Sequence, residues 1–134
     1  MENRVLFTDL EEINEITEQI IGLAIKVHRA LGPGLLESVY QMALAHELTK
    51  AKIKFNKEMA IPVEYDGLRM DIGFRCDFLV DDRVIVECKS VNAISVMDQA
   101  QLLNYLKLAK KKAGLLINFN VILLKDGIRR LLSN

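Results

Sequence analysis

This chain of 134 residues has no tryptophan, only two cysteines and no excess of charge of either sign. Two cysteines cannot build the disulfide framework that stabilises small secreted domains, so Cys76 and Cys88 are expected to be free thiols. Eighteen basic residues balance eighteen acidic ones, whereas a strong non-specific nucleic-acid binder is usually basic. These shortages exclude a disulfide-rich scaffold and argue against binding of DNA or RNA by net charge alone.

Histidines and long apolar runs are equally scarce. His28 and His46 are separated by the Gly-Pro-Gly break at 32–34, and neither has a Cys or His at zinc-ligand spacing, so contacts on a helix surface or in the core are expected. No apolar run approaches the roughly 20 residues that a membrane helix needs. The first ten residues lack an apolar segment of the length that a secretory signal has. We therefore expect a cytoplasmic protein without a membrane span.

Two helices are predicted in the first fifty residues. Apolar residues recur every three or four positions from Ile13 to Ala30, which predicts a helix that begins near Thr8 or Asp9 and ends at Leu31-Gly32-Pro33-Gly34. A second helix is predicted from about Leu35 to Lys50. Its expected buried residues are Leu36, Val39, Tyr40, Ala43, Leu44 and Leu48.

The period of the apolar residues then changes to that of strands. Three strands are predicted, namely Phe55–Tyr65, Leu68–Val80 and Val84–Lys89. Asp66-Gly67 is a strong hairpin turn between the first two. Pro62 places the first strand at a sheet edge, and Gly73 is expected to mark a bulge in the second. The third strand is apolar on both faces and is therefore expected to be central.

A third helix is predicted after these strands, with Ser95 and Asp98 as a capping pair at its start. It should run to about Lys112, with Gly114 as its stop. The remaining predicted elements are a buried strand at Leu115–Phe119 and a final hairpin of Val121–Leu124 and Ile128–Leu132. Residues 1–134 have the size of one domain and, at 51% apolar content, enough apolar residues for a core. The order α-α-β-β-β-α-β-β predicts a single domain of the α/β (α+β) class.

Charged residues interrupt the apolar strands at one place. Asp77 belongs to the second strand, and Glu87-x-Lys89 ends the third. Because side chains alternate along a strand, Glu87 and Lys89 emerge on one face. Charged groups in an apolar hairpin need compensation, and a divalent cation provides it while also doing chemistry. A charge-neutralised structural cluster would give the same residues, so both interpretations stay open here.

A shared site at these residues requires a particular turn. A two-residue turn at Asp81-Asp82 would place Asp77 opposite Val86, so that its side chain points away from Glu87. A turn of odd length, or a bulge, would place Asp77 opposite Glu87. The hypothesis of one site therefore predicts an odd-length turn, with Cys76 opposite Cys88.

Three further residues belong to the candidate site. Glu37 lies early in the second predicted helix, just after the Gly-Pro-Gly break. Gln101 and Tyr105 are four positions apart on the third helix, so they project from one face. That helix follows Lys89 closely, which ties its start to the end of the third strand.

These residues in this order resemble the PD-(D/E)XK nuclease superfamily, and Gln101-x-x-x-Tyr105 is similar to the element of its RecB-like branch. Gly34-Leu35-Leu36-Glu37-Ser38-Val39-Tyr40 matches the motif that names the GxxExxY family within it. The resemblance covers about Ile20 to Arg130. Cys76 stands where the superfamily motif has proline, a position that varies widely. The resemblance implies a restriction-endonuclease-like core, in which helices flank a central mixed β-sheet.

The resemblance also implies a metal-dependent nuclease that hydrolyses DNA or RNA. Asp77 and Glu87 would bind Mg²⁺ or Mn²⁺, with the main-chain carbonyl of Cys88 and the Glu37 carboxylate as further ligands. Lys89 would orient or deprotonate the attacking water.

On the third helix, the resemblance implies that Gln101 fixes Lys89 or the nucleic-acid backbone, and that Tyr105 lines the groove. Other interpretations remain open. The alternative to a nuclease is a catalytically silent member of the fold that binds nucleic acid or a protein partner. A further expectation is a homodimer that forms through the apolar segment Val121–Leu132. The lysines Lys107, Lys110, Lys111 and Lys112 are either a contact face or a solvated helix end.

Overall fold

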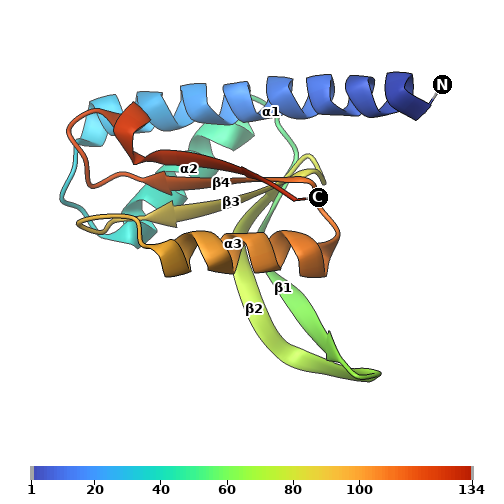
Figure 1. Ribbon diagram of the computed structural model, residues 1–134. Coiled ribbons are helices and arrows are strands. Elements are labelled where there is room, and N and C mark those ends of the chain that lie inside the picture. The colour runs from blue at the N-terminus through green and yellow to red at the C-terminus, as the bar shows by residue number, and fades with distance from the viewer. Residues whose placement is uncertain (1, 134) are drawn as a thin grey trace.

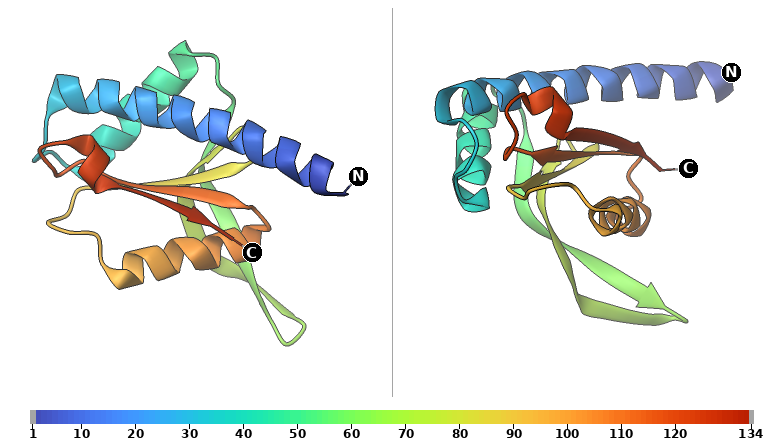
Figure 2. Two further views of the ribbon diagram at one scale, coloured as in Figure 1. Left: turned by 45° about the horizontal axis from the view of Figure 1, so that its top comes forward. Right: turned by 60° about the vertical axis from the view of Figure 1, so that its left-hand side comes forward.

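A five-stranded mixed sheet lies between two helices on one face and a third helix on the other (Figures 1 and 2). The computed structural model describes residues 2–133, except the side chains of residues 2–8 and 72. The elements are α1 (Glu2–Leu31), α2 (Glu37–Lys50), β1 (Phe55–Tyr65), β2 (Leu68–Val80), β3 (Val84–Lys89), α3 (Val96–Ala109), β4 (Ala113–Asn118), the 3₁₀ turn η1 (Leu124–Gly127) and β5 (Ile128–Leu132). This architecture confirms the predicted fold class and the order of helices and strands.

The sheet order is β1-β2-β3-β4-β5, and only the β3–β4 pair among the described strands is parallel. The three strands predicted from period-two patterning have the bounds that the sequence indicates. Pro62 lies in an edge strand and β3 is central, as predicted. The parallel step arises because α3 is the crossover between β3 and β4, which carries the chain back to the same end of the sheet.

β1 and β2 continue as a two-stranded arm that extends past α3 (Figure 1). The register of this pair shifts between Ile61 opposite Phe74 and Val63 opposite Met70, which confirms the bulge predicted at Gly73. A Cβ atom on Gly73 would lie 2.0 Å from the Ile61 carbonyl oxygen. Only glycine lets the two backbones approach so closely here.

Several predicted boundaries are wrong. The helix α1 begins at Glu2 rather than near Thr8 or Asp9. The apolar stripe marks where this helix contacts the sheet, and the backbone helix begins earlier. At the other end of the chain, α3 stops at Ala109 because Lys110 adopts a left-handed conformation with φ 56° and caps the helix.

The prediction that Gly114 stops α3 is therefore wrong, because Gly114 lies inside β4. A Cβ atom on Gly114 would meet the Leu102 side chain at 3.0 Å. The small residue lets α3 lie close against the sheet, which is a tertiary reason that local sequence does not reveal.

The second helix and the C-terminal hairpin also differ from expectation. α2 begins at Glu37, and Leu36 and Val39 are exposed rather than buried, with 74% and 38% of their surface accessible. Residues 121–123 form no strand; instead β5 pairs with β4. The segment still exposes Ile122 and Leu123 to solvent, and a dimer through it remains a prediction.

Two apolar clusters fill the space on either side of the sheet. Cys88 belongs to the cluster under α1 and α2, whereas Cys76 belongs to the cluster under α3. The two free thiols therefore face opposite sides and are not cross-strand neighbours, contrary to the prediction. His28 is buried and its Nε2 lies 2.8 Å from the Val121 carbonyl oxygen, in agreement with the expected core contact. In the described part of the chain, no helix is both long and apolar enough to cross a membrane.

Gly73 offers a test of the arm. Gly73→Ala should lower the free energy of unfolding by about 1–3 kcal/mol, because the new methyl group meets backbone rather than a movable side chain. Gly22→Ala is the matched control, since nothing lies within 4 Å of its Cβ position, and it should raise stability by up to about 1 kcal/mol. Urea denaturation of both variants measures the difference. Equal stability of the two variants would contradict the close approach at Gly73.

Candidate active site

The turn between β2 and β3 has the odd length that a shared site requires. Val80 pairs with Val84, and Phe78 pairs with Val86, so three residues separate the strands. Two of them, Asp81 and Asp82, have positive φ angles of 51° and 56°. Continuing this register by one residue places Asp77 opposite Glu87, as predicted.

At Asp77 and Glu87 the side chains replace the backbone ladder. The Cys88 N–H donates to Asp77 Oδ2 at 2.8 Å, and the Asp77 N–H donates to Glu87 Oε1 at 3.2 Å. Beyond this point β2 follows β1 into the arm, whereas β3 continues beside β4 (Figure 1). The two carboxyl groups therefore lie in the fork where the strands separate.

The backbone of Cys88 adds a further oxygen to this fork. In an extended strand, the N–H and C=O of one residue point to the same side. The Cys88 N–H points to Asp77, so its carbonyl also faces β2, while the next carbonyl, of Lys89, accepts from Phe119 N–H at 2.9 Å. Two carboxylates and one carbonyl are hard oxygen donors, which suit a divalent cation.

Burial of Glu87 leaves its charge poorly compensated. Only 7% of Glu87 is exposed. Burial, the neighbouring Asp77 charge and contact with the Asp77 carboxyl group raise the pKa of Glu87 to about 9. At neutral pH Glu87 therefore retains its proton beside the Asp77 carboxyl group. A bound cation would replace that proton, which is the chemical reason that the donor set fits a metal.

Lys89 is half-buried on the same face of β3 as Glu87. Its Nζ lies 3.8 Å from Asp98 Oδ1 in the first turn of α3. Asp98 also accepts from the Ser95 N–H at 2.9 Å, while Ser95 Oγ accepts from the Asp98 N–H, which confirms the predicted capping pair. The Ser95 N–H and then its hydroxyl hold the pKa of Asp98 below its ordinary value, so this carboxylate stays charged beside the lysine.

Glu37 is the first residue of α2, which lies on the opposite face of the sheet from α3. Burial raises the pKa of Glu37, the Lys89 charge lowers it and the Asp77 charge raises it, so these three groups act on one another. However, no three His, Cys, Asp or Glu side chains within the described residues are gathered as metal ligands. The structure thus joins Asp77 and Glu87 but does not bring Glu37 into a three-carboxylate cluster with them.

Tyr40 holds the loop that leads to Glu37. Its hydroxyl donates to the Gly32 carbonyl at 2.6 Å and accepts from the Leu35 N–H at 3.1 Å. Its ring stacks on Phe119 with centroids 4.5 Å apart and an interplanar angle of 6°. Gly34 supports the same loop with a φ of 94°. The glycine and tyrosine of the motif at 34–40 therefore position the loop, and its glutamate faces the candidate site.

Tyr105 and Gln101 differ in their relation to the carboxyl pair. Tyr105 is 5% exposed, and burial first, then the Glu87 and Asp77 charges, raise its pKa to about 12. Tyr105 therefore lies near the carboxyl pair, and its role in lining a groove stays a prediction. Gln101 is half-buried one turn earlier, and no hydrogen bond joins it to Glu87 or Lys89 among the described residues. Leu102 and Leu106 of α3 are buried against the sheet.

Asn118 is a supporting residue that the sequence did not reveal. It ends β4 directly beside Lys89 and is 2% exposed. Its amide accepts from the Val91 N–H at 3.1 Å and donates to the Val91 carbonyl at 2.9 Å. Asn118 thus holds the loop that connects Lys89 to α3. A polar residue at the end of a buried strand was the available signal.

The lysines after α3 lie at the opposite end of that helix from Asp98. Lys111 Nζ lies 3.2 Å from Asp82 Oδ1, and Lys112 Nζ lies 2.5 Å from Asp9 Oδ2. Two of the four lysines are therefore in ion pairs within the chain, and they do not line the candidate site.

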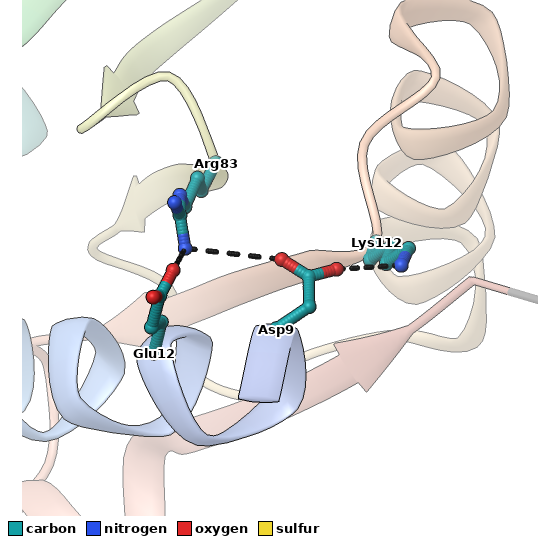
Figure 3. Close-up of polar contacts among 4 residues, drawn as sticks. All are labelled: Asp9, Glu12, Arg83 and Lys112. Carbon is teal, nitrogen blue, oxygen red and sulfur yellow. Dashed lines mark hydrogen bonds and ion pairs between the residues drawn. The ribbon is translucent and has the colours of Figure 1, made fainter. Parts of the chain in front are cut away.

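Figure 3 shows how one of these pairs continues into a small network between α1 and the sheet. Arg83, in the β2–β3 turn, contacts Glu12 and lies 3.8 Å from Asp9. The hydrogen bond from Lys112 lowers the pKa of Asp9. Such exposed pairs contribute little stability. They connect α1 to the turn that sets the register of the site.

Comparisons with known proteins agree with this geometry. Residues 14–131 match the model of a family described as PD-(D/E)XK nuclease superfamily. The chain belongs to this superfamily, which implies a nuclease-like function on nucleic acid; its nucleases generally use divalent metal ions. A search of curated proteins found no significant match.

A solved structure titled "Crystal structure of SSO0001" has the same fold, with a TM-score of 0.50 and 19% identity. The match covers 72% of this chain and 48% of that chain. This chain therefore spans about half the length of the solved structure, and the likeness shows the fold alone.

The raised pKa of Glu87 predicts how stability depends on pH. Because the folded state holds the proton up to about pH 9 and the ordinary pKa is 4.5, unfolding releases a proton between these values. Stability of the metal-free protein should therefore fall as pH rises from about 5 to 9. Glu87→Gln should remove much of this slope, and millimolar Mg²⁺ should oppose it in the native chain only.

Thermal melting across this pH range, with and without Mg²⁺, measures the effect. Glu64→Gln is the control, because Glu64 is exposed on β1. A Glu87→Gln variant with the slope of the native protein would show that the buried carboxyl pair is not its source.

Tyr40 offers a second test of the site. Tyr40→Phe keeps the ring on Phe119 but leaves the Gly32 carbonyl and the Leu35 N–H without the hydroxyl. The free energy of unfolding should fall by about 1–2 kcal/mol. Tyr65→Phe should have little effect, since Tyr65 is 72% exposed. Urea denaturation of the two variants gives the comparison, and equal losses would contradict the role of the Tyr40 hydroxyl.

Proposed function

We propose that this protein is a metal-dependent phosphodiesterase that cuts DNA or RNA. The observation that carries the proposal is the buried Asp77–Glu87 pair in the fork of β2 and β3, with Lys89 on the same face as Glu87. Such a pair, with a proton held at neutral pH, costs stability unless a cation replaces the proton. Membership of the nuclease superfamily supports the same conclusion.

Asp77, Glu87 and the Cys88 carbonyl would hold Mg²⁺ or Mn²⁺, and Glu37 would contribute through a water molecule. When bound, the cation supplies Lewis acidity and lowers the pKa of a water molecule. The residues of the chain would bind the cation, orient the attacking water and exclude bulk water. Asp98 holds the Lys89 ammonium, so that Lys89 would orient the attacking water or offset charge on the phosphate. Tyr105 closes one wall and keeps bulk water from the pair.

Within the superfamily, we propose the GxxExxY family and the RecB-like branch as the finer placement. Support comes from Gly34 and Tyr40, which position the loop before Glu37. Tyr105 beside the carboxyl pair, with Gln101 one turn earlier, supports the branch.

A second candidate function is favoured by one observation. The described residues gather no third acidic side chain with Asp77 and Glu87. A nuclease-fold protein that binds nucleic acid or a protein partner without cutting would have such an incomplete site. The two candidates predict different results in the same experiment.

Labelled single- and double-stranded DNA and RNA, incubated with the protein and Mg²⁺ or Mn²⁺, distinguish them. The native protein should cut at least one substrate, and chelation of the metal should stop cutting. Asp77→Asn and Lys89→Ala should each reduce the rate by about 100-fold or more. Lys57→Ala is the control, because Lys57 is exposed on the edge strand.

Cutting that persists in Asp77→Asn and Lys89→Ala would contradict the assignment of the site. Binding of nucleic acid without any cutting by the native protein would support the second candidate instead.

A further inference from the structure

A groove separates the arm from the outer side of α3. It has a volume of about 290 Å³, and its walls include Phe74 of β2 and Met97, Gln101 and Asn104 of α3. Phe74 is 40% exposed and Met97 is 74% exposed, so apolar surface faces solvent here. The base of the arm passes beside α3, and its tip extends past the helix (Figures 1 and 2).

The groove borders the candidate active site. Asp98 lines it and also lies 3.8 Å from the Lys89 ammonium. The Phe74 ring lies against the Tyr105 ring, with centroids 4.9 Å apart and an interplanar angle of 50°. A molecule in the groove would therefore lie next to whatever Lys89 contacts.

The lining of the groove suits a nucleobase rather than a phosphate. Its walls combine an aromatic ring, a thioether and the amides of Gln101 and Asn104, which lie one turn apart on α3. None of the described residues that line it is a lysine or an arginine. An aromatic face stacks on a base, and amides donate to and accept from base edges. In a duplex both the face and the pairing edge of a base are occupied, so only an unpaired base fits these contacts.

We propose that this groove holds the base of an unpaired nucleotide beside the scissile phosphate, so that the substrate class is single-stranded nucleic acid. The proposal rests on the proposed nuclease function and adds a substrate to it. Phe74 stacks on the base, and Gln101 and Asn104 contact its edge. The neutral net charge of the chain agrees with recognition through bases rather than through the backbone alone.

The test compares two proteins that both carry Lys89→Ala, which slows cutting. One retains Phe74 and the other also carries Phe74→Leu. Leucine keeps an apolar contact with Tyr105 but removes the π face. Fluorescence anisotropy gives the affinity for short single strands of DNA and of RNA and for a duplex, with Mg²⁺ present. Each single strand is also made with abasic positions, which lack the base but keep the backbone.

Phe74→Leu should weaken binding of the intact single strand about tenfold, which corresponds to the loss of one stacked base. It should not change binding of the abasic strand, because there is no base to stack. Phe74→Tyr should restore binding. Tyr65→Leu is the matched control, since Tyr65 is an exposed aromatic residue on the same arm outside the groove. The DNA and RNA arms identify which strand the groove accepts.

Equal binding of intact and abasic strands by the Lys89→Ala protein that retains Phe74 would overturn the proposal, and this comparison does not depend on whether Phe74→Leu folds. A preference for duplex would overturn it as well. If the unmodified protein cuts duplex and single strands equally and Phe74→Leu cuts like it, the groove proposal fails while the nuclease function stands. If the unmodified protein neither binds nor cuts any substrate, both fail together.

Discussion

The register of β2 on β3 is the constraint on which the candidate site depends. Three residues between Val80 and Val84 place Asp77 opposite Glu87, and a turn shorter by one residue would send the two carboxyl groups to opposite faces. The carboxyl groups then take the positions of missing ladder bonds, each accepting from the backbone N–H of the other strand. The same contacts that hold the strands together at the fork therefore bring two charges into a buried place.

The remaining elements act on this fork from separate directions. α3 supplies Asp98 to Lys89 and covers the pair with Tyr105. On the other side, Tyr40 fixes the loop that starts α2 and presents Glu37. α2 and α3 lie on opposite faces of the sheet, so the site depends on the cover of both faces.

Local signals in the sequence were enough to predict the first three strands, the capping pair at Ser95 and the bulge at Gly73, because turn chemistry and side-chain alternation act over a few residues. The end of α3 was missed because Gly114 is small for a tertiary reason, its contact with Leu102. The exposure of Val39 depends on how α2 is rotated against the sheet. Asn118 and Phe74 acquire their roles from partners on other elements, which no local pattern encodes.

Cys88 contributes to opposite sides of the protein with different parts of the same residue. Its N–H contacts Asp77 in the fork, while its thiol is buried in the cluster under α1 and α2. Every amino acid except proline brings the same N–H and carbonyl to that place. The chemistry at the fork is thus insulated from the side chain at position 88, which is free to vary with the packing of the opposite layer alone. A substitution at position 88 can therefore change the side chain and leave the backbone groups at the fork in place.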